Sequence, residues 1–270
     1  MSNEFVGRGR SRTQLLDRAS LARFTAACGG DPAREEDASP LAHWSWFLDA
    51  TPDHALGPDG HLAHGGFLPT FDHAPRRMFA ASRMRFHANL TLEAPATERT
   101  VIAAITEKSG RSGPLCFVEL SREITQDGAL RIEEHQTLVF RGAGEAEMAA
   151  LPQTAADADV APEDGELWQP DAVALFRFSA ATFNAHRIHY DLPYTREVEH
   201  YPALVVHGPL TAAKLAALAA RGGPLREFSF RALAPLFAGQ PVRLVRTGDG
   251  EATALRCDGT RAMSASYQSR

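Results

Sequence analysis

Cysteine is scarce in this sequence. Cys28, Cys116 and Cys257 lie far apart and are odd in number. No two of them have the CxxC spacing of a zinc site or a dithiol redox pair. This usage is typical of a reducing compartment. We therefore expect a cytoplasmic protein in which the three thiols are small buried apolar groups.

Long apolar runs and a strong excess of one charge are also absent. The apolar stretches are shorter than the roughly 18 residues that a membrane span requires. The start, MSNEFVGRGRSRTQ, lacks the apolar core of a secretory signal. Lys and Arg number 28 against 33 Asp and Glu, a net charge of −5, and we find no clustered basic face of the kind that binds nucleic acid. We expect neither a membrane nor a nucleic acid as a partner.

One segment of the chain differs from the rest in composition. Residues 142–167 carry seven acidic residues, no basic residue and two prolines. Such a segment buries little apolar surface, so we interpret it as an exposed acidic linker. The linker separates residues 1–141 from residues 168–270, and each part has a length that suits one domain.

The first part combines a helix with a run of strands. Residues 17–28 predict a helix that ends at Gly29 and Gly30. Strand patterns follow at 100–108, 115–125 and 130–140, joined by the turn-forming sequences SGRSGP and QDGA. These three strands predict an antiparallel meander.

The second part repeats this order more clearly. Pro209 suits the first turn of a helix over residues 209–221, and Gly222 and Gly223 come after it. Strand patterns then continue to the C-terminus, with Asp-Gly turns at 249–250 and 258–259. A helix followed by antiparallel strands in each half predicts an α+β fold with two antiparallel sheets, each wrapped around a helix.

The stretch FNAHRIHYD places four polar side chains close together: Asn184, His186, His189 and Asp191. A histidine and an amide, His189 and Asn184, could hold a catalytic water across a strand-to-loop turn. A metal site of His186, His189 and Asp191 is an alternative, but the neighbouring residues look strand-like and no third ligand position is evident, so we expect no metal. A third interpretation, that His186 satisfies buried backbone groups, stays open.

The start of the 209–221 helix is a second candidate site. Its first turn has free N–H groups and the positive end of the helix dipole. His207 and Gly208 precede it, and glycine lets a ligand approach the backbone. These features favour stabilisation of an oxyanion. A plain helix start, with glycine and proline as local geometry, is the alternative.

The sequence FSAATFNAHRIHYD…YPALVVHGPL resembles the MaoC-like hydratases and dehydratases of the hot-dog fold. Ile188 to Asp191 match the end of their Ile-His-x-Asp motif, and Val206 to Gly208 match the start of their central helix. In the first part GGFLP (65–69), RRMFAASRMRF (76–86) and EKSGRSGPLCFV (107–118) look like the branch of type 2 hydroxyacyl-thioester dehydratases and mesaconyl-C4-CoA hydratases.

The resemblance implies a double hot-dog fold with a degenerate first repeat, 1–141, and a catalytic second repeat, 168–270. Asn184 falls on the position of the family's aspartate, and His186 on that of its asparagine. His189 then becomes the general base, Asn184 positions the water, and the N–H of Gly208 stabilises an enolate. An amide cannot accept the proton, so Asn184 is a departure from the family pattern.

The resemblance also implies a reaction and a substrate class. It implies a hydratase or dehydratase that adds water to a short enoyl-CoA, with a C5 dicarboxylic acyl group (mesaconyl-C4-CoA or itaconyl-CoA, giving citramalyl-CoA). CoA is the expected carrier, with a thioester on a carrier protein as the alternative; no metal or redox cofactor takes part, and homo-oligomers are common. We expect the substrate to be bound by residues of both parts: Arg76, Arg77, Arg83, His186, Arg187, Tyr190 and His207. A dehydratase of fatty-acid metabolism, a thioesterase and a non-catalytic acyl-CoA binder are the rivals.

Overall fold

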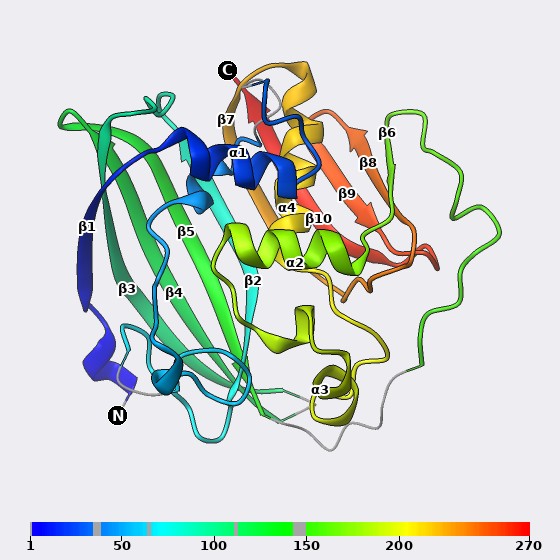
Figure 1. Cartoon of the computed structure of the whole chain (residues 1–270), viewed down its shortest axis with the longest axis horizontal. Coiled ribbons are helices and arrows are strands. Elements are labelled where there is room, and N and C mark those ends of the chain that lie inside the picture. The colour runs from blue at the N-terminus through cyan, green and yellow to red at the C-terminus, as the bar shows by residue number, and fades with distance from the viewer. Residues whose placement is uncertain (1, 35–38, 64–65, 111–112, 143–149) are drawn as a thin grey trace.

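The computed structural model describes residues 2–34, 39–63, 66–110, 113–142 and 150–270. Within these ranges ten strands form one continuous antiparallel sheet (Figure 1). The strands are β1 (Gly9–Leu15), β2 (Arg76–Phe86), β3 (Pro95–Gly110), β4 (Gly113–Gln126), β5 (Ala129–Arg141), β6 (Gly165–Trp168), β7 (Leu225–Ala232), β8 (Val242–Gly248), β9 (Glu251–Leu255) and β10 (Arg261–Ser269).

The strand order shows that one topology occurs twice. From the centre outward, the first half runs β2-β5-β4-β3-β1 and the second half runs β7-β10-β9-β8-β6. The two halves join at the centre, where Ala81 to Arg85 of β2 pair with β7. The double hot-dog fold is therefore confirmed, with one correction. Because β2 and β7 hydrogen bond to each other, the two expected sheets form a single one.

Four α-helices accompany the sheet in the described residues: α1 (Arg18–Ala27), α2 (Ala172–Ala181), α3 (Leu192–Glu197) and α4 (Gly208–Ala219). The expected helices over 17–28 and 209–221 correspond to α1 and α4. Asp17, Asp171 and Asp191 accept backbone N–H bonds at the starts of α1, α2 and α3. The described residues also include short 3-10 turns: η1 (Ser2–Phe5), η3 (Ala42–Ser45), η4 (Asp53–Ala55), η5 (Arg187–His189) and η6 (Ala220–Gly222).

Helix α4 lies against the second half of the sheet. It contacts β7, β8, β9, β10 and the neighbouring β2. Leu210, Leu215 and Leu218 are almost fully buried, and so are Ala212, Ala213 and Ala216. Small side chains let the helix approach the strands closely, so the expected wrapping of a helix by the sheet is confirmed for this half.

The first half differs from that expectation. Helix α1 contacts mainly α2 and η3, and in Figure 1 it lies beside α2 and α4. Between α1 and β2 the described residues form 3-10 turns, loops and one isolated β-bridge, between Leu56 and Leu62. Trp44, Trp46 and Phe47 are buried there in the main core. Prolines and glycines recur along 40–75 and disfavour a helix, so this loop covers part of the sheet where a second central helix was expected.

The acidic segment is attached to the second repeat along its described part. Residues 143–149 lie outside the described residues. Residues 165–167, expected in the linker, belong to β6 and pair with β8. Asp157 and Asp164 form ion pairs with Arg243 and Arg246 of β8. Since the acidic side chains meet basic residues of a strand, the segment past residue 150 runs along the sheet. The division into two domains stays a prediction.

The main hydrophobic core is shared by both repeats. Phe24 and Phe86 of the first repeat and Phe178, Leu215 and Phe228 of the second belong to one cluster of buried side chains. Cys116 and Cys257 are buried and Cys28 is half-buried, as expected for small apolar groups. None of the helices in the described residues is both long and apolar enough to cross a membrane.

Candidate active site

A cavity of about 1720 Å³ is lined by residues of both repeats. Its wall includes seven of the residues that the sequence singled out: Arg76, Arg77, Asn184, His186, His189, Tyr190 and Gly208. The three others, Arg83, Arg187 and His207, do not line it in the described part of the chain. The cavity therefore brings together the main elements of the expected site and leaves out part of the expected substrate-binding set.

The FNAHRIHYD stretch forms a tight turn, and the strand-like expectation for it is wrong. The Oδ1 atom of Asn184 accepts the N–H of His186 at 3.0 Å, and η5 follows. Asp191 then starts α3 by accepting the N–H of Tyr194. Because amide and carboxylate side chains close these turns locally, the chain does not extend.

His189 is buried at the cavity wall with a defined tautomer. Its Nδ1 lies 2.7 Å from the carbonyl oxygen of Val205. A carbonyl only accepts, so Nδ1 carries the proton and Nε2 carries a free electron pair. Burial lowers the pKa of His189 to about 4, against the opposing effect of the Val205 bond. The ring is neutral at pH 7 and can accept a proton.

His207 lies behind His189 and supports it. The two rings stack with centroids 3.5 Å apart and planes inclined by 20°. Nε2 of His207 lies 2.9 Å from the hydroxyl oxygen of Ser179, and the residue is 0% exposed. Burial, followed by the nearby His189, holds its pKa well below the usual range. The expected contact of His207 with substrate is therefore wrong, because its ring has no exposed surface.

Gly208 and Asn184 supply groups that can meet a ligand. Gly208 is the first residue of α4, and its N–H has no acceptor within the described ranges. Asn184 is half-buried. Its Oδ1 is occupied by the His186 N–H, and its Nδ2 has no partner among the residues that the structure describes. Asn184 can thus offer N–H groups to a water, a donor role that differs from the acceptor role of an aspartate.

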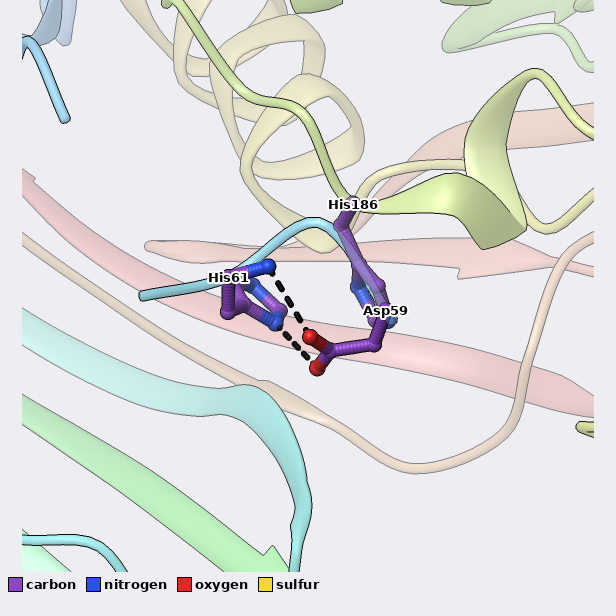
Figure 2. A group of neighbouring side chains, drawn as sticks. All are labelled: Asp59, His61 and His186. Atoms are coloured by element: carbon purple, nitrogen blue, oxygen red, sulfur yellow. Dashed lines mark hydrogen bonds and ion pairs between the residues drawn. The ribbon is translucent and has the colours of Figure 1, made fainter. Parts of the chain in front are cut away.

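Asp59 and His61 of the first repeat reach the same place, and the sequence did not single them out. Oδ2 of Asp59 lies 2.8 Å from Nδ1 of His61, and Oδ1 accepts the His61 backbone N–H at 2.9 Å. The ring of His61 lies 4.3 Å from the ring of His186 (Figure 2). The turn GPDGHL was a signal for a local Asp-His contact, but nothing local indicated its distant partner, His186.

The charges of this cluster are set by burial and by neighbours. Burial would raise the pKa of Asp59, but the hydrogen bonds and charge of His61 lower it to about 2. Burial lowers the pKa of His186 to about 2, with contributions from His61 and His189. Burial and then Arg77 lower the pKa of His61. At neutral pH the carboxylate is charged and the imidazoles are neutral.

The three side chains could by position hold a cation, since one ligand atom of each lies within 4.8 Å of the others. The guanidinium of Arg77 is close enough to lower the pKa of His61 and His186, and it would repel a metal ion there. The metal set considered from the sequence is not assembled. Asp191 instead accepts two N–H bonds from Arg187.

The expected arginines have different surroundings. Arg76 forms an ion pair with Glu199 at 2.9 Å, and Arg187 pairs with Asp191 at 2.7 Å. Arg83 is exposed and borders a separate surface hollow beside Glu227 and Ser229. Arg83 and Arg187 are therefore not placed to bind a substrate in the main cavity. Tyr190 is exposed at the cavity wall and donates its hydroxyl to the carbonyl of Ala185.

Solved structures share this fold. One is a MaoC-like dehydratase from Phytophthora capsici. The structural match covers 100% of this chain and 98% of that one, with a TM-score of 0.71 and 14% identity. Another is a Mycobacterium tuberculosis protein described as having a double hot-dog fold. This match covers 97% of this chain and 95% of that one, with a TM-score of 0.54 and 14% identity. The fold of this chain is therefore the hot-dog fold of the MaoC-like class.

The sequence comparisons give the family. The chain belongs to the hydroxyacyl-thioester dehydratase type 2 family, which matches residues 41–238. It is 43% identical to a mesaconyl-C(4)-CoA hydratase from Chloroflexus aurantiacus over 94% of each chain. It is 28% identical to a mitochondrial hydroxyacyl-thioester dehydratase type 2 from Schizosaccharomyces pombe over 76% of each chain. The family resemblance drawn from the motifs is confirmed.

Proposed function

We propose that this protein is a hydratase that adds water to the double bond of a C5 dicarboxylic acyl-CoA, with mesaconyl-C4-CoA as substrate and citramalyl-CoA as product. The relative with 43% identity over 94% of both chains is named for mesaconyl-C4-CoA. Itaconyl-CoA has the same number of acyl carbons and is the second substrate to test.

One observation carries the mechanism: the bond between Nδ1 of His189 and the Val205 carbonyl. It fixes the ring with the electron pair of Nε2 free, at the wall of a cavity that also includes Asn184 and Gly208. A general base, a group that positions water and an oxyanion donor are the three parts that hydration of an enoyl thioester requires.

In the proposed reaction, Nε2 of His189 accepts a proton from a water held by the Asn184 amide. The water oxygen bonds to the β-carbon and the electrons of the double bond move to the thioester oxygen. The Gly208 N–H and the positive end of α4 stabilise the resulting enolate. The imidazolium of His189 then returns the proton to the α-carbon, so that one water is added. The steps are two proton transfers and one addition of water, with no net oxidation or reduction, so we propose a reaction without a metal or redox cofactor.

The rivals differ in what they do to a thioester. The reverse reaction on a 3-hydroxyacyl thioester of fatty-acid metabolism is the second candidate, because the matching family is described as hydroxyacyl-thioester dehydratases. A thioesterase is disfavoured, since helix α4 contains no Asp or Glu that could serve as nucleophile or base. A non-catalytic acyl-CoA binder would have no need of the fixed tautomer of His189.

The test is a panel of thioesters incubated with the purified protein. We expect mesaconyl-C4-CoA to lose its enoyl absorbance and gain the mass of one water, and we expect crotonyl-CoA to react more slowly. Release of free CoA from acetyl-CoA would indicate a thioesterase instead. Absence of any reaction, with acyl-CoA still bound, would contradict the hydratase and favour the binder.

Location and assembly are also part of the proposal. We propose a cytoplasmic enzyme, because its three cysteines are unpaired in the structure and disulfides are rare in that compartment. The partner is an acyl-CoA. Homo-oligomers are a further expectation, and light scattering of the purified chain measures them directly.

A further inference from the structure

Several arginines line the cavity, and they differ in whether another side chain pairs with them. Arg10 and Arg12 pair with Asp49, and Arg122 pairs with Glu98 and Glu134. Arg76 pairs with Glu199, and Arg141 donates to the hydroxyl of Tyr201. The guanidinium of Arg77 alone among these cavity arginines has no hydrogen-bond or ion-pair partner within the described residues. A half-buried cation without a partner is costly to desolvate, and an anionic ligand would remove that cost.

The position of Arg77 on β2 directs it to the catalytic groups. Arg77 and Phe79 are two residues apart in the strand, so their side chains point to the same face. Phe79 packs against Trp44 and Phe230, and its carbonyl oxygen lies 3.6 Å from where a Cβ on Gly208 would be. The Arg77 backbone is thus about 7 Å along the strand from Phe79, the residue that meets the start of α4.

The nearest carboxylate to these histidines is already engaged. Asp59 attracts Arg77 at a distance, but both its oxygens bond to His61. The contact of Asp59 with His61 is seen in Figure 2, and within the described residues Asp59 forms no hydrogen bond or ion pair with Arg77. After burial, Arg77 is the next cause that lowers the pKa of His61. It also lowers the pKa of His186, by less than burial, His61 and His189 do, so its charge acts on the cluster.

The chemistry of the proposed substrate places an anion at the same point. In mesaconyl-C4-CoA the free carboxylate is bonded to the β-carbon, the atom that receives the hydroxyl. This carboxylate must therefore lie next to the water that His189 activates. The ring of His186 is 5.3 Å from that of His189 and 4.3 Å from that of His61, so the cluster forms the adjacent part of the site.

We infer that Arg77, beside the Asp59–His61 pair, binds the free carboxylate of a dicarboxylic acyl thioester and so selects it over a monocarboxylic one. This inference rests on the proposed function for the identity of the substrate. A guanidinium fork binds a carboxylate through two parallel N–H bonds, and in a half-buried site such a pair discriminates strongly against a methyl group.

A pair of saturated analogues tests binding independently of hydration. Succinyl-CoA and butyryl-CoA have the same acyl length and differ only in a carboxylate or a methyl on the β-carbon. We expect the wild-type protein to bind succinyl-CoA more tightly, by calorimetry or by competition. Arg77→Gln should weaken the binding of succinyl-CoA by about 10²–10³-fold and leave the affinity for butyryl-CoA within about threefold of the wild-type value. Arg77→Lys retains the positive charge without the guanidinium fork, so it should lose less affinity for succinyl-CoA.

The control variants separate this residue from others. Arg83→Gln removes a charge from the exposed face of β2 and should change the affinity for neither analogue. Arg141→Gln removes a charge from the cavity itself and should not alter the ratio of the two affinities. A ratio that depends on Arg141, or a wild-type protein that does not prefer succinyl-CoA, would overturn the inference. An unchanged thermal unfolding midpoint shows that Arg77→Gln is folded.

The two proposals can fail separately. If the wild-type protein hydrates mesaconyl-C4-CoA but Arg77→Gln lowers kcat/KM equally for mesaconyl-C4-CoA and crotonyl-CoA, the carboxylate subsite is wrong and the hydratase stands. If no enoyl thioester is hydrated but the Arg77-dependent preference for succinyl-CoA is present, the subsite stands and the proposed activity is wrong.

Discussion

The imidazole of His189 uses its two nitrogens differently, and one substitution removes both. His189→Ala removes Nε2, the proton acceptor of the proposed reaction, and it also removes the bond to the Val205 carbonyl. We expect kcat to fall by about 10²–10⁴-fold, the usual contribution of a positioned general base. The measurement is hydration of mesaconyl-C4-CoA, with thermal unfolding as the control for folding.

Asn184 should matter less than His189, because in the proposed reaction it positions the water without accepting its proton. Asn184→Ala should lower kcat by a smaller factor than His189→Ala. Asn184→Asp restores the carboxylate of the family pattern and should keep activity with an altered pH dependence. Loss of all activity in Asn184→Asp, together with activity in His189→Ala, would show that the two roles are assigned wrongly.

The pH profile of kcat/KM follows from the buried state of His189. In the proposed reaction the neutral ring is the active form, and burial lowers the pKa of His189 to about 4. The rate should therefore stay level as the pH falls through about 6.5, where an exposed histidine titrates. It should decrease only near pH 4. An acid limb centred at about 6.5, with the protein still folded, would contradict a buried base.

At the scale of single elements, the turn at Gly60 fits against the FNAHRIHYD stretch. Gly60 has a φ of +89°, and an added Cβ would lie 1.9 Å from the carbonyl oxygen of Ala185. Gly60→Ala should push the Asp59–His61 turn away from His186. We expect a loss of activity and a lower unfolding midpoint, because backbone strain of about 1–2 kcal/mol adds to the clash.

Gly128 provides the matched control for this substitution. It lies in the turn between β4 and β5 at a φ of +74°, and an added Cβ would have nothing within 4 Å. Gly128→Ala therefore carries the backbone strain without the clash. It should lower stability by about 1–2 kcal/mol and keep kcat unchanged. Equal losses of activity in both variants would show that the contact with Ala185 has no part in the site.

The elements that the sequence predicted correctly have local chemical signals. Helices over 17–28 and 209–221 carry an Asp cap, a Pro start or Gly stops. The Asp127-Gly128 turn has positive φ at both residues, as a two-residue hairpin requires. In the loop over 40–75 the turn GPDGHL signals only the local contact of Asp59 with His61, so neither the place of the loop in the core nor the position of His61 beside His186 could be predicted. The contact of His61 with His186 joins distant parts of the chain and leaves no local pattern.

At the scale of the whole molecule, the two repeats share one core and one sheet. Phe24 and Phe178 pack with ring centroids 5.7 Å apart, and β2 pairs with β7. Residues 1–142 and 150–270 produced separately would each expose a sheet edge and half of this core. We expect neither part to fold alone, and we expect a single cooperative transition for the full chain in calorimetry.

Production of both parts in one cell provides the check. If the shared core drives folding, the two parts should associate and regain hydratase activity. A stable, folded second part on its own would show that the repeats are independent and that the junction of β2 and β7 contributes little to stability.

The junction of β2 and β7 within one chain also affects how the protein can change by mutation. In a dimer of identical single-repeat chains, every substitution is inherited at both equivalent positions, so a change that improves one site alters the other as well. Here a codon for His61 or Arg77 belongs to one repeat, and a codon for His189 belongs to the other. Each repeat can therefore accumulate substitutions separately, and one could lose its central helix while the other kept its catalytic residues.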